Sequence, residues 1–161
     1  MNHVSQAKDR LKARLDAHLA TVLAAADAEA DDGFTTPPPA VILTFPSAGT
    51  QEYPSIEMVV QNSLKRAESV VDDYQHRVML AVTVVGDDEE TIVRNLERYM
   101  WALRKFGSDH IDRDMPDPND AVDVIICGSE AYTPLLRGPS GGVEHPFVQG
   151  GFIEMLITTI E

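Results

Sequence analysis

The sequence has few of the residues that mark disulfide-bonded, nucleic-acid-binding or membrane-spanning proteins. Cys127 is the only cysteine among 161 residues, so no disulfide can form within the chain. Thirteen Lys and Arg residues face 26 Asp and Glu residues, which gives a formal net charge of −13. A protein that neutralises DNA phosphates over a broad face needs clustered basic residues, so this balance argues against wrapping or sequence-specific DNA binding.

Long apolar runs are also missing. No stretch approaches the roughly 18 apolar residues of a membrane-spanning helix, and the first 20 residues lack the apolar core of a signal peptide. We therefore expect synthesis in the cytoplasm and no contact with a membrane. Hydrophobic residues make up 43% of the chain and charged residues 24%, which is ordinary for a folded domain. The length predicts a single domain over residues 1–161.

The first part of the chain predicts a helix followed by a linker. The helix is predicted over residues 1–26, where apolar residues recur at helical spacing: Val4, Ala7, Leu11, Leu15, Leu19, Val22 and Ala26. After it, acidic residues, Gly33 and three prolines interrupt this spacing, so residues 27–40 are predicted to form an acidic, proline-containing linker.

The remainder, residues 41–161, predicts a sheet with one central helix. The segment at 76–86 is apolar on both of its alternating faces, which is typical of a central strand. A long loop is expected over 129–151. Other strands are expected at 40–45, 55–61, 121–128 and 152–160. The predicted fold class is α/β of the α+β kind: a mixed, mainly antiparallel sheet of about five strands, with the N-terminal helix and the central helix packed on it.

The central helix begins in "VVGDDEETIVRNLERYMWALRKF", where four consecutive carboxylates follow an apolar strand. Asp87 is the expected N-cap, and Glu90 completes a D-x-x-E capping box, which satisfies unpaired N–H groups at the positive end of the helix dipole. The stripe from Ile92 to Phe106 is expected to face the core, and Gly107 to end the helix. A metal site would need converging His or further carboxylates, and this segment has no histidine.

Trp101 is out of place on the predicted helix, because it lies about half a turn from the apolar stripe, among charged residues. Another element of its own chain covers it, for example the N-terminal helix, or it is left exposed, or a partner buries it. With Arg98 and Lys105 it forms a candidate subunit interface, since Trp and Arg are enriched at such contacts. The predicted 129–151 loop adds three further interface candidates, namely Leu135, Leu136 and Phe147.

Several motifs resemble catalytic or metal-binding sites but lack the required context. "GPSGG", residues 138–142, has the spacing of a nucleophile elbow, yet Pro146 and the glycines after it argue against the helix that must follow. Asp112 and Asp114 have calcium-loop spacing, but the glycine and the distal glutamate of such a loop are missing. The five histidines are scattered. The sequence thus predicts no catalytic, metal-binding or cofactor-binding residue, and no enzyme.

The order of these pieces, with "HRVMLAVTVVGDDEETIVRNLERYMWAL" at the centre and "GGFIEMLITTI" at the end, resembles the tail terminator and tail completion proteins of long-tailed bacteriophages. In that family an alternating apolar strand enters an acidic loop and then a helix with an R-Y-x-x-A-L-like core. Arg98, Tyr99, Ala102 and Leu103 match that core. The resemblance covers most of residues 1–161 and consists of a pattern more than of fixed residues.

The resemblance implies a structural virion protein that forms a homo-oligomeric ring, usually a hexamer, at the neck of the virus. Such a ring ends growth of the tail tube below it and joins the connector of the filled head above it during virus assembly. Genomic DNA passes through its channel without specific binding. Other possibilities are a different head–tail connector or a tube component. From other classes, a small metal-dependent enzyme or a cytosolic binding module also fits the sequence.

Overall fold

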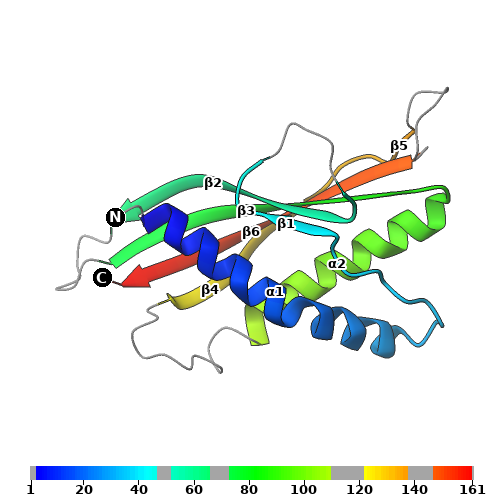
Figure 1. Cartoon of the computed structure of the whole chain (residues 1–161), viewed down its shortest axis with the longest axis horizontal. Coiled ribbons are helices and arrows are strands. Elements are labelled where there is room, and N and C mark those ends of the chain that lie inside the picture. Colours follow the sequence, from blue (N-terminus) through cyan, green and yellow to red (C-terminus); the bar gives the residue numbers. More distant parts are fainter. Residues whose placement is uncertain (1–2, 47–51, 66–72, 110–121, 138–146, 161) are drawn as a thin grey trace.

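The protein folds as one sheet with two helices lying along the same face of it (Figure 1). The structure, a computed structural model, describes residues 3–46, 52–65, 73–109, 122–137 and 147–160. The elements in chain order are α1 (His3–Ala30), β1 (Val41–Leu43), β2 (Ser55–Lys65), β3 (Asp73–Gly86), α2 (Glu89–Asp109), β4 (Val122–Tyr132), β5 (Leu136–Arg137) and β6 (Phe147–Ile160).

The sheet has six strands in the order β1-β2-β3-β6-β4, and β5 pairs with the start of β6. β1 runs parallel to β2, while the other pairings are antiparallel. β3 and β6 pair along their full length of 14 residues, from Gly86 opposite Phe147 to Asp73 opposite Ile160. The predicted α+β class, with a mixed and mainly antiparallel sheet carrying two helices, is confirmed.

α2 connects two strands that are not neighbours. β3 and β4 are both antiparallel to β6, which lies between them, so they run parallel to each other and need a crossover. α2 supplies this crossover and lies over β6, where a β-carbon added to Gly151 would come 2.8 Å from the Met100 sulfur and 3.1 Å from Leu96 Cδ1. The absence of a side chain at Gly151 therefore lets the helix lie close to the sheet.

The core forms between this helix layer and one face of the sheet. The apolar stripe of α1 predicted from the sequence is confirmed from Ala7 onward, since Ala7, Leu11, Leu15, Leu19, Val22 and Ala26 are all buried. The stripe of α2 is confirmed too, and its Tyr99 hydroxyl donates a hydrogen bond of 2.6 Å to the Pro37 carbonyl oxygen. Burial raises the pKa of Tyr99 far above its usual range.

Both helices are longer than predicted. α1 continues through residues 27–30, which the sequence analysis gave to the linker, and the chain leaves it where Asp31 (φ 46°) and Gly33 (φ 74°) adopt positive φ. α2 continues past Gly107, the residue expected to end it, to Asp109. Gly107 is buried within the helix, so a small residue fits there and the helix need not end.

The predicted loop over 129–151 is also wrong in large part. β4 extends to Tyr132, β5 occupies two residues, and β6 already begins at Phe147. Thr133 bridges the strands, because its N–H donates to the Gly150 carbonyl and its hydroxyl accepts from the Gly150 N–H, each at 2.8 Å. Among the described residues, neither helix has a segment long and apolar enough to cross a bilayer.

Candidate functional site

The sheet face opposite the helices carries apolar side chains that no described element covers. Along β3 the residues from Val78 to Val84 alternate, with the even-numbered ones buried under the helices and Met79 and Ala81 on the other side. Directly paired residues share a face, so Val59 beside Met79 and Phe152 beside Ala81 lie there too. Val59 is 38% exposed. We call this surface the open face.

The sequence analysis predicted that β3 is central because both of its faces are apolar. β3 is central, with β2 on one side and β6 on the other. Only one of its faces is covered by helices within the described part of the chain. The open face is mixed, because Glu57 lies beside Ala81 and Arg77 lies 3.6 Å from Glu154 next to Met79. Its apolar side chains are therefore a patch bordered by charged residues, and no described element covers that patch.

The carboxylates at the start of α2 have separate roles. Asp88, not Asp87, is the N-cap, because its Oδ2 accepts from the backbone N–H of Thr91 at 2.9 Å and from the Thr91 hydroxyl at 2.7 Å. These hydrogen bonds, from the hydroxyl first and then the backbone, lower the pKa of Asp88. Glu90 does not reach back to close a capping box, since its Oε1 lies 2.5 Å from Arg94 Nη2. The cap is one residue later than predicted.

Arg98 binds its own chain. Its Nη1 lies 2.8 Å from Asp27 Oδ1 and its Nη2 2.5 Å from Asp32 Oδ2, and its side chain is only 11% exposed. Both ends of its guanidinium thus bind the end of α1, and a role of Arg98 at a subunit interface stays a prediction. Asp27 also accepts hydrogen bonds from the Thr36 hydroxyl and N–H. At Asp32, the hydrogen bond from the Phe34 N–H lowers the pKa of the carboxyl group, and the charges of Arg98 and Arg94 lower it further.

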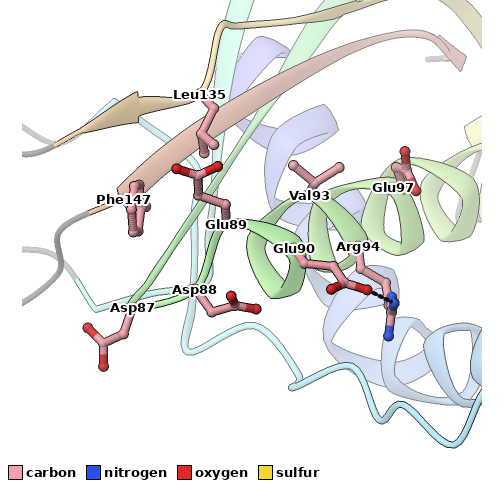
Figure 2. A pocket seen from close by; sticks show the side chains of 9 residues that line it. All are labelled: Asp87, Asp88, Glu89, Glu90, Val93, Arg94, Glu97, Leu135 and Phe147. Carbon is pink, nitrogen blue, oxygen red and sulfur yellow. Dashed lines mark hydrogen bonds and ion pairs between the residues drawn. The ribbon is translucent and has the colours of Figure 1, made fainter.

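An open hollow of about 700 Å³ lies between the start of α2 and the start of β6, and we call it the acidic hollow. Figure 2 shows that Glu89 directs its carboxylate toward Leu135 and Phe147, while Asp87 points away from them. The structure thus brings together Asp87, Glu90, Leu135 and Phe147, which the sequence analysis singled out for separate reasons. The residues that line the acidic hollow are Asp87, Asp88, Glu89, Glu90, Val93, Arg94, Glu97, Leu135 and Phe147.

The acidic hollow combines an apolar base with negative charge. Val93 is 36% exposed, and Leu136, next to the lining residue Leu135, is 56% exposed. Five carboxylates line the hollow and one cation, Arg94, offsets them. Such a surface favours a ligand that carries both an apolar group and positive charge.

Trp101 lies away from the acidic hollow, in a groove of about 460 Å³ between the end of α1, the middle of α2 and β4. It is half-buried and packs against the core, so its own chain covers part of it, which is one of the three possibilities that the sequence left open. Tyr132, 48% exposed, forms the far side of the groove, and burial and the Glu130 carboxylate raise its pKa. Lys105 is exposed further along α2 and does not line this groove.

Sequence reasoning missed two exposed aromatic residues. Tyr132 fell within the predicted loop, and nothing in its neighbourhood marks it as part of a groove. Phe45, which is 57% exposed, ends the segment predicted as the first strand and reads there as a core residue. It lies just after β1, beside Thr44, whose carbonyl oxygen accepts from Lys8 Nζ at 2.6 Å.

The described residues contain no group of three or more His, Cys, Asp and Glu placed to hold a metal ion. His76 is buried on β3, with Nδ1 2.8 Å from the Ser63 hydroxyl. The Asp112 and Asp114 pair and the "GPSGG" segment lie outside the described residues.

The comparisons with known proteins are negative: the sequence matches no family model, and no curated protein matches it.

Proposed function

We propose that this chain is a structural virion protein that assembles with copies of itself into a ring at the neck of a phage tail. In this role it ends growth of the tail tube and joins the tail to the head. The observation that carries the proposal is the open face, where Val59, Met79 and Phe152 form an apolar patch bordered by charged residues, opposite the helix layer. Surfaces of this kind mark protein–protein contacts.

The charge of the chain fits the same role. With 26 acidic residues and 13 basic residues, the assembled surface repels a polyanion. A channel wall with that character lets DNA move through without holding it. A ring also requires heterologous contacts, in which two different surfaces of the subunit meet, and this chain has several distinct candidate surfaces. The sequence that forms the strand–helix unit from β3 to α2 is the segment on which the resemblance that suggested this role is based.

The decisive experiment measures the mass of the assembled protein and images it with and without purified tail tubes. We expect a closed ring, with six subunits as the first expectation, that binds one end of the tube and prevents further polymerisation of tube subunits. A species that stays monomeric at all concentrations and leaves tube growth unchanged would overturn the proposal. Binding along the whole tube would instead identify a tube component.

A charged residue on the open face tests the observation itself. Ala81→Lys places an ammonium group in the middle of that face, between Glu57 and Phe152. We expect the subunit to stay folded, with ring formation weakened about tenfold or more. The matched control is Ala25→Lys on the exposed side of α1, which we expect to assemble normally. Equal assembly of both variants would show that the open face is not an interface.

A further inference from the structure

The groove around Trp101 combines two aromatic rings with several charged groups, and we call it the aromatic groove. It lies where the end of α1, the middle of α2 and the end of β4 meet, and its volume is about 460 Å³. The lining residues that carry a ring or a charge are Glu29, Glu97, Arg98, Trp101, Arg104 and Tyr132.

The two aromatic side chains of the groove remain accessible to a ligand. Trp101 is half-buried and packs against the core, and Tyr132 is 48% exposed. The faces of tryptophan and tyrosine rings carry negative electrostatic potential and therefore attract cations. The aromatic groove thus offers two rings to a positively charged group.

The arginines of the groove are already paired within the chain, whereas two of its carboxylates are not. Arg98 binds two carboxylates at and just beyond the end of α1, and Arg104 lies 2.9 Å from Glu130. The side chains of Glu29 and Glu97 are exposed, and no hydrogen bond or ion pair joins them to another residue in the described part of the chain. The groove therefore retains negative charge for a ligand to neutralise.

This negative charge acts at the aromatic rings themselves. Burial raises the pKa of Tyr132, the Glu130 carboxylate raises it further and that of Glu97 adds to the effect, while Arg104 opposes it. The negative charges that disfavour loss of the phenol proton also favour a cation beside the ring. Aromatic and acidic groups thus attract the same kind of ligand here.

Arginine is the cation that fits this groove best. Its planar guanidinium stacks on aromatic rings, and it donates two parallel hydrogen bonds to one carboxylate, whereas the lysine ammonium is a compact point charge. This chain carries only 13 Lys and Arg residues against 26 Asp and Glu residues. The arginine therefore comes more readily from a basic protein than from another copy of this chain.

We propose that the aromatic groove binds an arginine side chain of a different, basic protein. The guanidinium lies against the rings of Trp101 and Tyr132. Its positive charge is offset by the carboxylates of Glu29 and Glu97. The inference goes beyond the proposed function, because a single subunit can make this contact without forming a ring.

Trp101 reports directly on the groove, because it is the only tryptophan of the chain and no other residue contributes indole fluorescence. The probe is the blocked peptide acetyl-Gly-Arg-Gly-Arg-Gly-amide. The matched control carries citrulline, which has nearly the shape of arginine without its charge. We expect the arginine peptide to change the emission with half-saturation at about 1 mM, and the citrulline peptide to leave it unchanged. Equal responses to both, or none up to roughly 10 mM, would overturn the inference.

Substitutions show which surface holds the peptide. Tyr132→Leu and Glu97→Gln should each raise the peptide concentration at half-saturation about threefold or more. Phe45→Leu removes an exposed aromatic group elsewhere, and Asp87→Asn removes a carboxylate that lines the acidic hollow and not this groove. Both controls should bind the peptide normally, and circular dichroism confirms that each variant is folded. Weaker binding by the controls alone would place the peptide on another surface and overturn the inference.

A second copy of the chain is the competing occupant. If a copy filled the groove, the Trp101 emission of the protein alone would change on dilution, and that result would overturn the assignment to a different protein. Ring formation is measured separately, by mass. A normal ring whose subunits do not bind the peptide would overturn this inference and leave the proposed function in place. Peptide binding by a subunit that forms no ring would support the inference and overturn the proposed function.

Discussion

Arg98 on α2 and Asp27 on α1 lie 71 positions apart in the sequence and meet at 2.8 Å, with Arg98 Nη1 donating to Asp27 Oδ1. The side chains are 11% and 14% exposed, so the pair is largely removed from water. The same guanidinium reaches Asp32 beyond the end of the helix. One residue therefore fastens the middle of α2 to the end of α1 and fixes how the two helices lie on the sheet.

Replacing Arg98 should cost stability more than assembly. Arg98→Ala leaves the largely buried Asp27 carboxylate without its cation and removes one of the two arginines beside Asp32, so we expect the free energy of unfolding to fall by about 2–3 kcal/mol. Arg104→Ala is the control, because that side chain is 51% exposed and its 2.9 Å pair with Glu130 should contribute about 0.5 kcal/mol or less. Urea unfolding measures both. Equal stability of the two variants would contradict the fastening role.

The position of the helix cap can be tested with two adjacent residues. Asp88→Ala removes the acceptor for the Thr91 N–H and hydroxyl, so the melting temperature should fall by roughly 2–4 °C. Asp87→Ala removes an exposed carboxylate that makes no contact with the helix end in the described structure, and it should leave the melting temperature nearly unchanged. The reverse order would restore the cap predicted from the sequence.

The sequence was sufficient for features set by local pattern and insufficient for those set by distant residues. The burial stripes of α1 and α2 follow from spacing alone, and so does the central position of β3. Asp87 and Asp88 are both good cap residues, so no local rule chooses between them. The Arg98 pair could not be predicted, because Asp27 and Asp32 come from a segment that reads as linker. The glycines near the start of β6 read as loop in the sequence, because only the packing of α2 on β6 shows why the strand needs them.

Acid should weaken the protein partly through Asp88. Its pKa is lowered in the folded state, so the carboxylate contributes stability that is fully present above its unfolded pKa and is lost as the pH falls through the folded pKa. Stability should therefore drop below about pH 4. Asp88→Asn keeps an acceptor for Thr91 but does not titrate, so its acid loss should be smaller. Asp32, whose pKa is lowered too, accounts for part of the remaining slope.

Unfolding measured between about pH 6 and about pH 3 checks this expectation. The difference in the free energy of unfolding between the unmodified protein and Asp88→Asn should shrink as the pH falls. A constant difference over the whole range would mean that the Thr91 hydrogen bonds do not depend on the charge of Asp88.

The two adjacent glycines of β6 provide the last prediction, because they face different surroundings. A β-carbon at Gly151 would lie 2.8 Å from the Met100 sulfur and 3.1 Å from Leu96 Cδ1, whereas the nearest atoms at Gly150 are 3.4 Å away. Gly151→Ala should therefore push α2 from the sheet and lower the free energy of unfolding by about 1–3 kcal/mol. Gly150→Ala should change it by about 0.5 kcal/mol or less, since ordinary contact distances remain.

Comparing the two variants by urea unfolding separates close packing from the general effect of replacing a strand glycine. Replacement of glycine in a strand by alanine normally restricts the unfolded chain and favours folding slightly. That gain applies at both positions, so a loss confined to Gly151→Ala must come from the helix above it. If both variants were equally stable, Met100 would have moved aside at little cost, and the close approach of α2 to β6 would not depend on the absence of a side chain there.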